Sequence, residues 1–222
     1  MARHRLRFVK EGRAIYLSHL DLMRTMQRVF IRAGVKIRHT EGFNPHPYIS
    51  VALPLSVGTE SCTELLDFEL ADDSPLSTLA ERLTEQLPEG ITVLEAYEAE
   101  RKVKEIVWLG LRGVLEYDGE QDMAETARAL ASFFAAGNIP VKKLTKKKEE
   151  TELDIAPLIR EITFTPKGPG EIALEAVLAA QNPSLNPALL IEALRQNAEG
   201  LVPDFAAFSR REVYDKDMRV FR

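Results

Sequence analysis

One feature constrains the fold of this chain more than any other: the order of extended and helical segments is nearly the same in its two halves. In residues 1–100 the order is strand, helix, strand, strand, helix, strand, because apolar residues alternate in the extended segments and recur every three or four residues in the helical ones. The second helix is expected to begin at Ser74-Pro75, with proline at its first position. Extended segments are predicted at 5–9, 35–39, 48–55, 64–70 and 91–99, and the first helix at 18–33.

Residues 101–222 repeat this order. Extended segments are predicted at 103–117, 139–144, 153–166, 171–179 and 208–215, with helices that begin at Asp122 or Gly119 and at Asn186-Pro187. The economical interpretation is an α+β fold of two tandem ferredoxin-like βαββαβ units, residues 1–100 and 101–222, each with an antiparallel sheet and both helices on one face. A single continuous α+β sheet is the alternative, because a sequence does not reveal how its two halves pack.

The charged residues are distributed unevenly along the chain. The formal net charge is −5, yet residues 1–50 contain ten Lys and Arg against three Asp and Glu. The first fifty residues are therefore +7 and the others −12. This asymmetry indicates an anionic partner for one face of the protein, with RNA as the candidate. A second lysine-rich segment at 142–148 is followed at once by Glu149 and Glu150, and we interpret it as a solvated loop.

Cysteine usage and hydropathy exclude several classes of protein. Cys62 is the single cysteine, which excludes an internal disulfide and any zinc or iron–sulfur site built from several thiolates. No apolar stretch approaches the roughly 20 residues of a membrane span, and the N-terminus lacks the apolar region of a secretory signal. His19, His39, His46 and Asp21 form no close-spaced metal motif. We therefore expect a cytoplasmic protein without a membrane contact, a metal or a cofactor.

The first predicted helix carries a row of arginines. Ser18 is the expected N-cap residue, and Asp21 at the third helical position forms a capping-box-like pair with it. Arg24, Arg28 and Arg32 follow at four-residue spacing, which places them on one side of the helix. Guanidinium groups suit phosphate oxygens, so the row is either a phosphate-contacting ridge or a solvated helix face. The arginines expected to add to the same positive field are Arg5, Arg7 and Arg13.

The segment GFNPHP, which starts at residue 42, is the strongest local signal. Its two prolines remove two backbone donors and favour extended conformations for the residues before them. We expect a stiff loop that presents Phe43, Asn44 and His46 in a fixed arrangement, so that little entropy is lost on binding. An exposed Phe43 or Tyr48 beside arginines suits stacking on single-stranded RNA. The alternative is a rigid turn between strands.

Two histidines are the candidates for catalysis, and the catalytic residues are otherwise unknown. His19 lies in the first turn of the predicted helix, where the positive end of the helix dipole disfavours the imidazolium form. His46 lies in the GFNPHP loop. A catalytic pair requires that the two side chains converge, and a packing or capping role is the alternative for His19. The sequence contains no P-loop, no dinucleotide-binding glycine pattern and no nucleophile elbow.

A series of long motifs carries a resemblance to a known family. The motifs are SHLDLMR (18–24), RAG (32–34), GFNPHP (42–47), ALPL (52–55), GTES (58–61) and LDIAPLI (153–159). They resemble the bacterial radical-SAM-linked proteins, a family of unknown function named for genes beside, or fused to, radical SAM proteins. The resemblance implies a radical SAM protein as a partner and no catalytic residue. This chain cannot itself be the radical SAM enzyme, because one cysteine cannot hold a four-iron cluster.

Three functions are consistent with these features. The leading hypothesis is a non-catalytic accessory that binds RNA, or presents an RNA or ribosome-associated substrate, to a radical SAM partner. The second is a metal-independent RNA endonuclease, with His19 or His46 as general base or acid and Arg24 stabilising the phosphorane; tandem ferredoxin-like domains in CRISPR RNA-processing endonucleases support it by fold analogy alone. The third is a protein–protein scaffold for the radical SAM partner. The expected binding residues are Arg7, Arg13, Ser18, His19, Asp21, Arg24, Arg28, Arg32, Phe43, Asn44 and His46.

Overall fold

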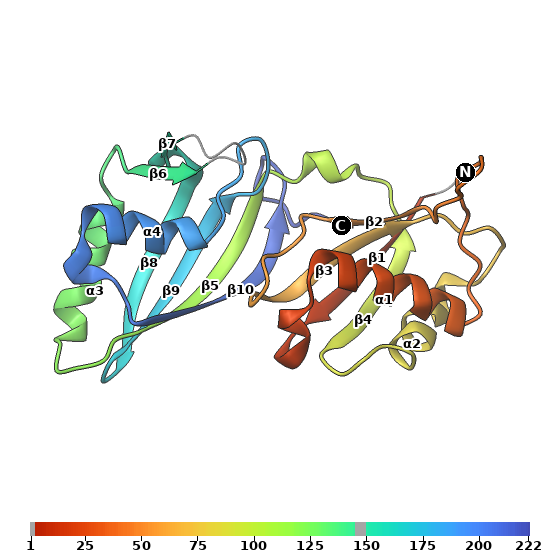
Figure 1. Ribbon diagram of the computed structural model, residues 1–222, viewed down its shortest axis with the longest axis horizontal. Helices are drawn as coiled ribbons and strands as arrows, with labels where there is room; N and C mark the ends of the chain where they lie inside the picture. The colour runs from red at the N-terminus through yellow and green to blue at the C-terminus, as the bar shows by residue number, and fades with distance from the viewer. Residues whose placement is uncertain (1–2, 145–149) are drawn as a thin grey trace. The chain divides into compact units, whose positions relative to one another are not determined.

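The computed structural model of the protein describes residues 3–144 and 150–222 (Figure 1). The chain divides into two compact units: Met1–Glu105 with Val220–Arg222 form unit 1, and Ile106–Arg219 form unit 2. Each unit mixes helices with antiparallel strands, which confirms the α+β class. The last three residues group with unit 1, a return of the chain that the sequence did not reveal. Most of the lysine-rich segment, at 145–149, lies outside the described residues.

Unit 1 contains two α-helices and a four-stranded antiparallel sheet in the order β4-β1-β3-β2. The elements are β1 (His4–Lys10), α1 (His19–Arg32), β2 (Ile49–Ala52), β3 (Glu60–Phe68), α2 (Leu79–Thr84) and β4 (Ile91–Glu98). Short 3-10 helices occupy Gly12–Tyr16, Leu76–Thr78 and Val103–Glu105. β1 therefore lies inside the sheet, and its apolar alternation is the strand pattern expected for residues 5–9.

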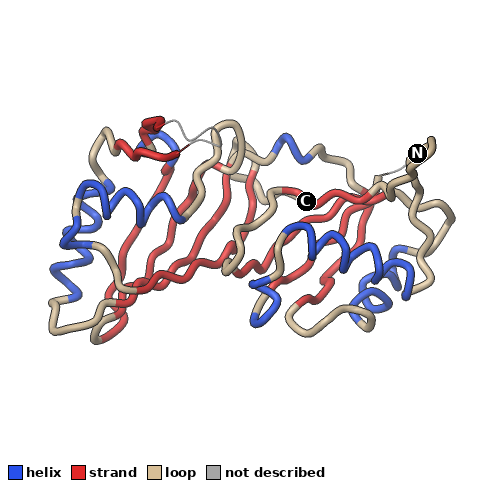
Figure 2. Tube along the Cα trace, viewed as in Figure 1, coloured by secondary structure: helices blue, strands red, loops and turns tan. Residues whose placement is uncertain are grey.

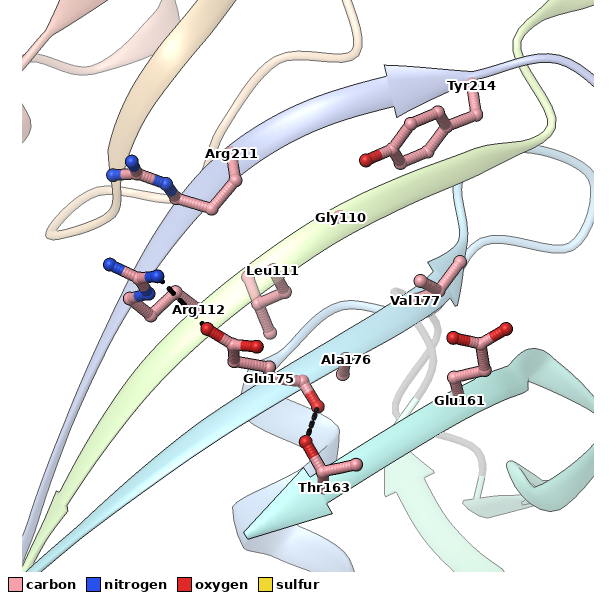
Figure 3. A pocket seen from close by; sticks show the side chains of 10 residues that line it. All are labelled: Gly110, Leu111, Arg112, Glu161, Thr163, Glu175, Ala176, Val177, Arg211 and Tyr214. Atoms are coloured by element: carbon pink, nitrogen blue, oxygen red, sulfur yellow. Dashed lines mark hydrogen bonds and ion pairs between the residues drawn. The ribbon is translucent and has the colours of Figure 1, made fainter. Parts of the chain in front are cut away.

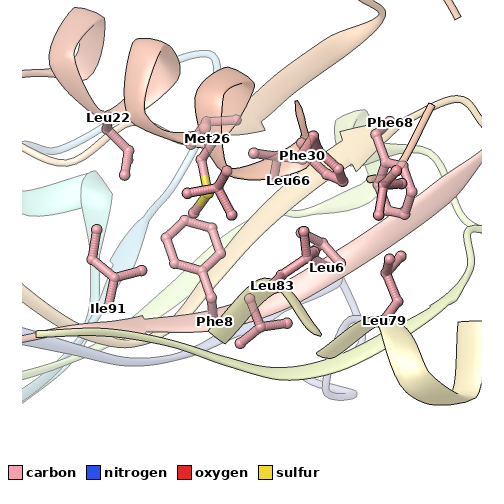
Figure 4. Close-up of a cluster of buried hydrophobic side chains, with 14 of the residues drawn as sticks. Leu6, Phe8, Leu22, Met26, Phe30, Leu66, Phe68, Leu79, Leu83 and Ile91 are labelled. Carbon is pink, nitrogen blue, oxygen red and sulfur yellow. The ribbon is translucent and has the colours of Figure 1, made fainter. Parts of the chain in front are cut away.

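The core of unit 1 lies between one face of this sheet and both helices (Figure 4). Leu6 and Phe8 of β1 are fully buried and belong to one cluster with side chains of α1 and α2. Each such side chain contributes about 1.5–3 kcal/mol on burial. The buried helical residues are Leu22, Met26, Val29 and Phe30 of α1 and Leu79 and Leu83 of α2. The buried residues of α1 define the side of this helix that faces the core, and its polar side therefore faces solvent.

Both ends of α1 follow the local chemistry of the sequence. Ser18 caps the helix: its Oγ accepts from the Asp21 backbone N–H at 3.2 Å and donates to the Asp21 carboxylate at 2.6 Å. The predicted cap is confirmed, although the carboxylate contacts the hydroxyl and not the backbone N–H of a full capping box. Gly34 ends the helix with φ at +66°, and the Val35 N–H donates to the Phe30 carbonyl, as in a Schellman motif.

The second helix begins later than the sequence predicted. Ser74-Pro75 does not open an α-helix, because Pro75 precedes a 3-10 turn and α2 starts only at Leu79. The Ser74 hydroxyl and N–H both bond the Asp72 carboxylate, so this serine closes a turn and does not cap a helix.

Segment 35–39 was predicted to be extended and forms no strand. It makes only two isolated bridges, Ile37 to Leu70 and His39 to Pro47. The second bridge joins the segment to the end of the GFNPHP loop. The segment therefore pairs with this loop and adds no strand to the sheet. The backbone hydrogen bonds of this bridge are donated by Thr40 and Tyr48, so Pro47 occupies a position that needs no backbone donor.

Unit 2 has a four-stranded antiparallel sheet in the order β10-β5-β9-β8, with a separate β6–β7 hairpin (Figure 2). The elements are β5 (Trp108–Glu116), α3 (Met123–Phe134), β6 (Pro140–Leu144), β7 (Glu150–Asp154), β8 (Ile159–Gly168), β9 (Glu171–Ala179), α4 (Ala188–Asn197) and β10 (Phe205–Tyr214), with 3-10 helices at Ala156–Leu158 and Glu199–Leu201. The Asp122 carboxylate caps α3, so of the two predicted starts, Asp122 and Gly119, the helix uses Asp122. Without the hairpin, the elements follow the same order as in unit 1.

Among the described residues, no helix combines the length and the apolar character needed to cross a bilayer.

Candidate functional site

The most distinctive surface of unit 1 joins the solvent-facing side of α1 to the segment that contains the GFNPHP loop. We call it the α1–loop surface and define it as the outward residues of α1 together with residues 36–48. On α1, Arg24 and Arg28 are exposed and lie among Leu20 and Ile31, whose side chains are 57% and 75% exposed. Apolar side chains at these positions depart from an ordinary solvated helix face, which carries polar residues.

The three arginines predicted to form a row differ in their contacts. Arg28 is exposed and forms no hydrogen bond or ion pair with the residues that the structure describes. Arg24 lies 3.9 Å from the Asp21 carboxylate, an exposed pair of the kind that contributes about 0–1 kcal/mol. Arg32 donates to the Gln86 carbonyl, so its guanidinium tethers the end of α1 to the segment after α2. Arg24 and Arg28 are therefore the two whose guanidinium groups are not tied to another segment of the described chain.

The GFNPHP loop closes at its base and leaves its tip in solvent. The Thr40 N–H donates to the His46 carbonyl at 2.8 Å, and the His46 N–H donates to the Thr40 hydroxyl at 2.9 Å. The Tyr48 N–H donates to the Arg38 carbonyl at 2.8 Å. Phe43 at the tip is fully exposed, and Asn44 and the His46 side chain are exposed beside it. All three side chains at the tip of the loop are thus exposed to solvent.

Beside the loop, a guanidinium is stacked on an aromatic ring. The Arg38 guanidinium carbon lies 4.9 Å from the centroid of the Tyr48 ring, and Nη1 is 2.8 Å from the Glu69 carboxylate. The ion pair holds the arginine over the ring. Together they form a cation–aromatic pair near the surface, and each of its two flat groups is one on which a nucleobase can stack.

A groove of about 600 Å³ lies between the C-terminal half of α1 and residues 35–49. Phe30, Ile37 and Ile49 supply apolar wall, while Gln27, His39 and Lys36 supply polar groups. The sequence did not reveal this groove, because its walls come from segments that meet only in the folded unit. One feature of the sequence could have indicated the groove: Ile31 is an apolar residue on the polar side of the helix, and it lines the groove.

A carboxylate stands near Lys36 at this end of the unit. The hydroxyl of Ser74 lowers the pKa of the Asp72 carboxyl; desolvation opposes the shift, and the Ser74 N–H and the charges of Lys36 and Arg82 support it. Asp72 is therefore ionised at neutral pH and partly balances Lys36. Within the described residues, no group of three or more His, Cys, Asp or Glu side chains is placed to hold a metal ion.

The two candidate catalytic histidines are held by different parts of unit 1. His19 opens α1, whereas His46 belongs to the loop whose Pro47 borders the groove beside Gln27. The rise along α1 from His19 to Gln27 is about 12 Å. No hydrogen bond joins His19 to His46 within the described chain. His39, which was not among the candidate catalytic residues, is the histidine that lines the groove.

The strand arginines do not contribute to the α1–loop surface as the sequence suggested. Arg5 and Arg7 alternate with the core-facing Leu6 and Phe8, so they lie on the opposite face of the sheet. Arg5 is fully buried, with Nε 2.6 Å from the Asp67 carboxylate, and Arg7 is paired with Glu95. Both charges are neutralised within unit 1. Arg13 is exposed in the 3-10 helix that precedes α1.

Unit 2 has a smaller depression, of about 370 Å³, on its sheet (Figure 3). The Arg112 guanidinium is 3.0 Å from the Glu175 carboxylate, which cancels much of its charge. The Tyr214 ring lies against Gly110, where an added Cβ would be 3.3 Å from the ring, and burial followed by the Glu212 charge raises the pKa of Tyr214. With Glu161 also at its edge, this depression has no net basic character.

Comparisons with solved structures concern the fold alone. A chain of the Cbf5-Nop10-Gar1 complex is similar, with a TM-score of 0.53 and 7% identity, over 95% of this chain and 48% of that chain. A chain of the archaeal box H/ACA sRNP Nop10-Cbf5 complex has a TM-score of 0.48 and 8% identity, over 93% and 46%. DyPB from Rhodococcus jostii RHA1 has a TM-score of 0.20 and 13% identity, over 93% and 89%. The protein thus spans about half the length of the first two.

No curated protein matches this chain. A family model does match it over residues 3–187, which include α1, the GFNPHP loop and both sheets except β10. The chain therefore belongs to the family described as uncharacterized protein conserved in bacteria (DUF2344).

Proposed function

We propose that this protein is a non-catalytic, cytoplasmic RNA-binding accessory that presents RNA, or a ribosome-associated substrate, to a radical SAM enzyme. The observation that carries the RNA-binding part is the α1–loop surface. Arg24 and Arg28 are exposed there without a strong carboxylate partner, and a fully exposed Phe43 lies in the same unit. Single-stranded RNA is bound by this combination, because arginines contact phosphates while aromatic rings stack on bases.

The stacked Arg38–Tyr48 pair supports the same proposal. A planar guanidinium over a ring offers a flat surface to a base, and every base has a flat face to meet it. The sequence motifs SHLDLMR and GFNPHP, on which the resemblance to radical-SAM-linked proteins depends, are the segments that build this surface. The radical SAM enzyme as partner rests on that resemblance.

The fold is compatible with this role. We interpret each unit as ferredoxin-like, since both have a four-stranded antiparallel sheet and two helices in the order βαββαβ, interrupted in unit 2 by the β6–β7 hairpin. The likeness to the Cbf5-Nop10-Gar1 complex chain extends over both units and adds no argument about function.

The test is a titration of a fluorescently labelled 12-nucleotide single-stranded RNA at several salt concentrations. We expect binding that weakens with salt, and a double variant, Arg24→Ala with Arg28→Ala, that binds more weakly. Its logarithmic salt slope should be smaller by about 1.4, because each phosphate contact on a single strand contributes about 0.7. The matched control is Arg112→Ala with Arg211→Ala in unit 2, which should bind as the wild type does. RNA binding that is absent at micromolar protein, or insensitive to salt, contradicts the proposal.

A protein–protein scaffold is the second candidate, and one observation favours it. Tyr16, Leu20 and Ile31 are 70%, 57% and 75% exposed on or beside α1, and exposed apolar side chains of this size mark protein interfaces. A pull-down from the native cell distinguishes the two functions. A radical SAM protein that is lost after nuclease treatment supports RNA binding, whereas one that remains at high salt after nuclease treatment supports the scaffold.

A further inference from the structure

The groove beside α1 has features of a ligand site that go beyond a general affinity for RNA. We propose that it holds one unstacked nucleobase of the bound strand, an inference that rests on the proposed RNA-binding function. Its volume of about 600 Å³ falls within the range of about 300–1,000 Å³ that is usual for small-ligand sites. The exposed Ile31 and the half-buried Ile49 supply apolar surface for the faces of a base.

Gln27 supplies the polar group that a base edge requires. Its side chain lines the groove and makes no hydrogen bond with the described part of the chain. A glutamine amide has donors and an acceptor side by side, and it can therefore pair with a base that offers the complementary set. An aliphatic side chain of a peptide in the same place leaves this amide without a partner, which costs free energy when the groove is closed to water.

His39 adds a second polar group, and one contact of its ring indicates the tautomer. Its Nδ1 lies 2.9 Å from the Ile37 carbonyl oxygen. Because a carbonyl oxygen only accepts, Nδ1 carries the hydrogen and Nε2 of the neutral ring is left as an acceptor. The ring lines the groove, so Nε2 can accept from an exocyclic amino group of a base.

The positive charges around the groove favour a base that carries a phosphate over a neutral ligand. Lys36 lines the groove and is exposed, and Arg28 follows Gln27 on the helix with no ion pair in the described chain. Asp72 offsets part of the Lys36 charge, which leaves Arg28 as the stronger phosphate contact. The backbone of the RNA thus continues from the groove onto the arginines of α1.

The experiment compares wild type and variants with two probes: a 12-nucleotide oligoadenylate and a ribose–phosphate chain of equal length without bases. Ala71 lines the groove and is exposed, so Ala71→Trp fills the groove without disturbing the core. We expect Ala71→Trp to weaken oligoadenylate binding about tenfold, since a base stack is worth roughly 5- to 150-fold, and to change binding of the base-free chain less than twofold. Ala136→Trp, an exposed substitution in unit 2, is the matched control and should change neither.

Gln27→Leu is the second variant, and it keeps the test valid if Ala71→Trp does not fold. We expect it to weaken oligoadenylate binding by about three- to tenfold and to reduce any preference among oligonucleotides of the four bases. If both folded variants bind oligoadenylate as the wild type does while wild-type binding remains salt-sensitive, the groove is not a base site and the proposed function stands. If the wild type shows no salt-sensitive binding at all, the proposed function and the base site fall together. A third outcome is that the Ala71→Trp variant loses a co-purified protein but binds RNA with full affinity. The groove would then bind a peptide, and the proposed base site would be wrong.

Discussion

Unit 1 and unit 2 have the same order of strands, yet they place their charged and aromatic side chains differently. In unit 1 the buried Arg5 is paired with Asp67, the exposed Arg24 has only a loose pair with Asp21, and the exposed Arg28 has no ion pair among the described residues. Unit 2 pairs Arg112 with Glu175 on the open surface of its sheet. The two units therefore have the same strand order but different charged side chains at their surfaces. A binding role proposed for unit 1 does not extend to unit 2.

The largest expected difference concerns the two ion pairs. Asp67→Ala leaves the fully buried Arg5 without its carboxylate and should destabilise unit 1 by about 3–5 kcal/mol. Glu175→Ala removes an exposed partner of Arg112 and should cost about 1 kcal/mol or less. Urea unfolding followed by circular dichroism measures both.

A conservative replacement of the whole buried pair provides the control. Arg5→Met combined with Asp67→Leu should recover most of the stability lost in Asp67→Ala, because no uncompensated charge remains. Equal unfolding midpoints for Asp67→Ala and Glu175→Ala contradict the proposed contrast between a buried and an exposed pair.

The next largest effect on stability is expected from replacing one closely packed glycine in each unit. An added Cβ at Gly90 would lie 2.4 Å from the Glu11 carbonyl oxygen, and at Gly170 it would lie 2.6 Å from the Tyr117 carbonyl oxygen. Both glycines have φ values, +88° and +71°, that other residues rarely adopt. Gly90→Ala and Gly170→Ala should each cost about 3 kcal/mol in thermal or urea unfolding. Gly119→Ala, with a positive φ but open space, should cost only about 1 kcal/mol; an equal loss there would mean that backbone conformation alone decides.

A smaller effect, confined to high pH, separates one tyrosine of each unit, Tyr117 of unit 2 and Tyr97 of unit 1. Burial, followed by the charge of Asp204, raises the pKa of Tyr117 to about 12 from 10.0, and its hydroxyl donates to the Leu201 carbonyl. Since the folded state holds this proton more tightly, the stabilisation is complete below pH 10 and is lost as the pH rises from 10 to about 12. The stability difference between wild type and Tyr117→Phe should therefore narrow over this range by on the order of 2 kcal/mol.

Tyr97 in unit 1 provides the comparison for that pH dependence. Burial also raises the pKa of Tyr97, but the neighbouring positive charge of Arg5 opposes the shift. The difference between wild type and Tyr97→Phe should narrow less than for Tyr117→Phe when urea unfolding is measured from pH 9 to pH 12. A larger narrowing at Tyr97 than at Tyr117 would contradict this effect of Arg5 on the pKa of Tyr97.

The smallest expected effect on stability is at the exposed aromatic residues. Phe43 in unit 1 is fully exposed and Phe205 in unit 2 is 57% exposed, so Phe43→Ala should change stability by less than about 0.5 kcal/mol. Phe43→Ala should still weaken single-stranded RNA binding about tenfold through lost stacking. Phe205→Ala should leave RNA binding unchanged. An equal loss of affinity in both variants would remove the distinction between the two surfaces.

Local chemistry in the sequence predicted the parts of unit 1 that depend on neighbouring residues. The Ser18 cap, the Gly34 helix end and the exposed, proline-stiffened loop around Phe43 each follow from interactions within a few residues. The predicted start of the second helix at Ser74-Pro75 was wrong, because Ser74 bonds Asp72 and so closes a turn before α2 begins. The local rule for a helix start was outweighed by a competing local hydrogen bond.

By itself, the sequence determined the α+β class, the ends of α1 and the exposure of Phe43, since each depends on periodicity or on contacts between near neighbours. Only the tertiary structure decided that Arg5 is buried against Asp67, that Arg7 lies on the opposite face from α1, and that Gln27 and His39 line one groove. The physical reason is that these contacts join residues distant along the chain, and strand register and helix packing bring them together. The basic N-terminal segment was therefore recognised from its composition, whereas the identity of its available charges depended on the fold.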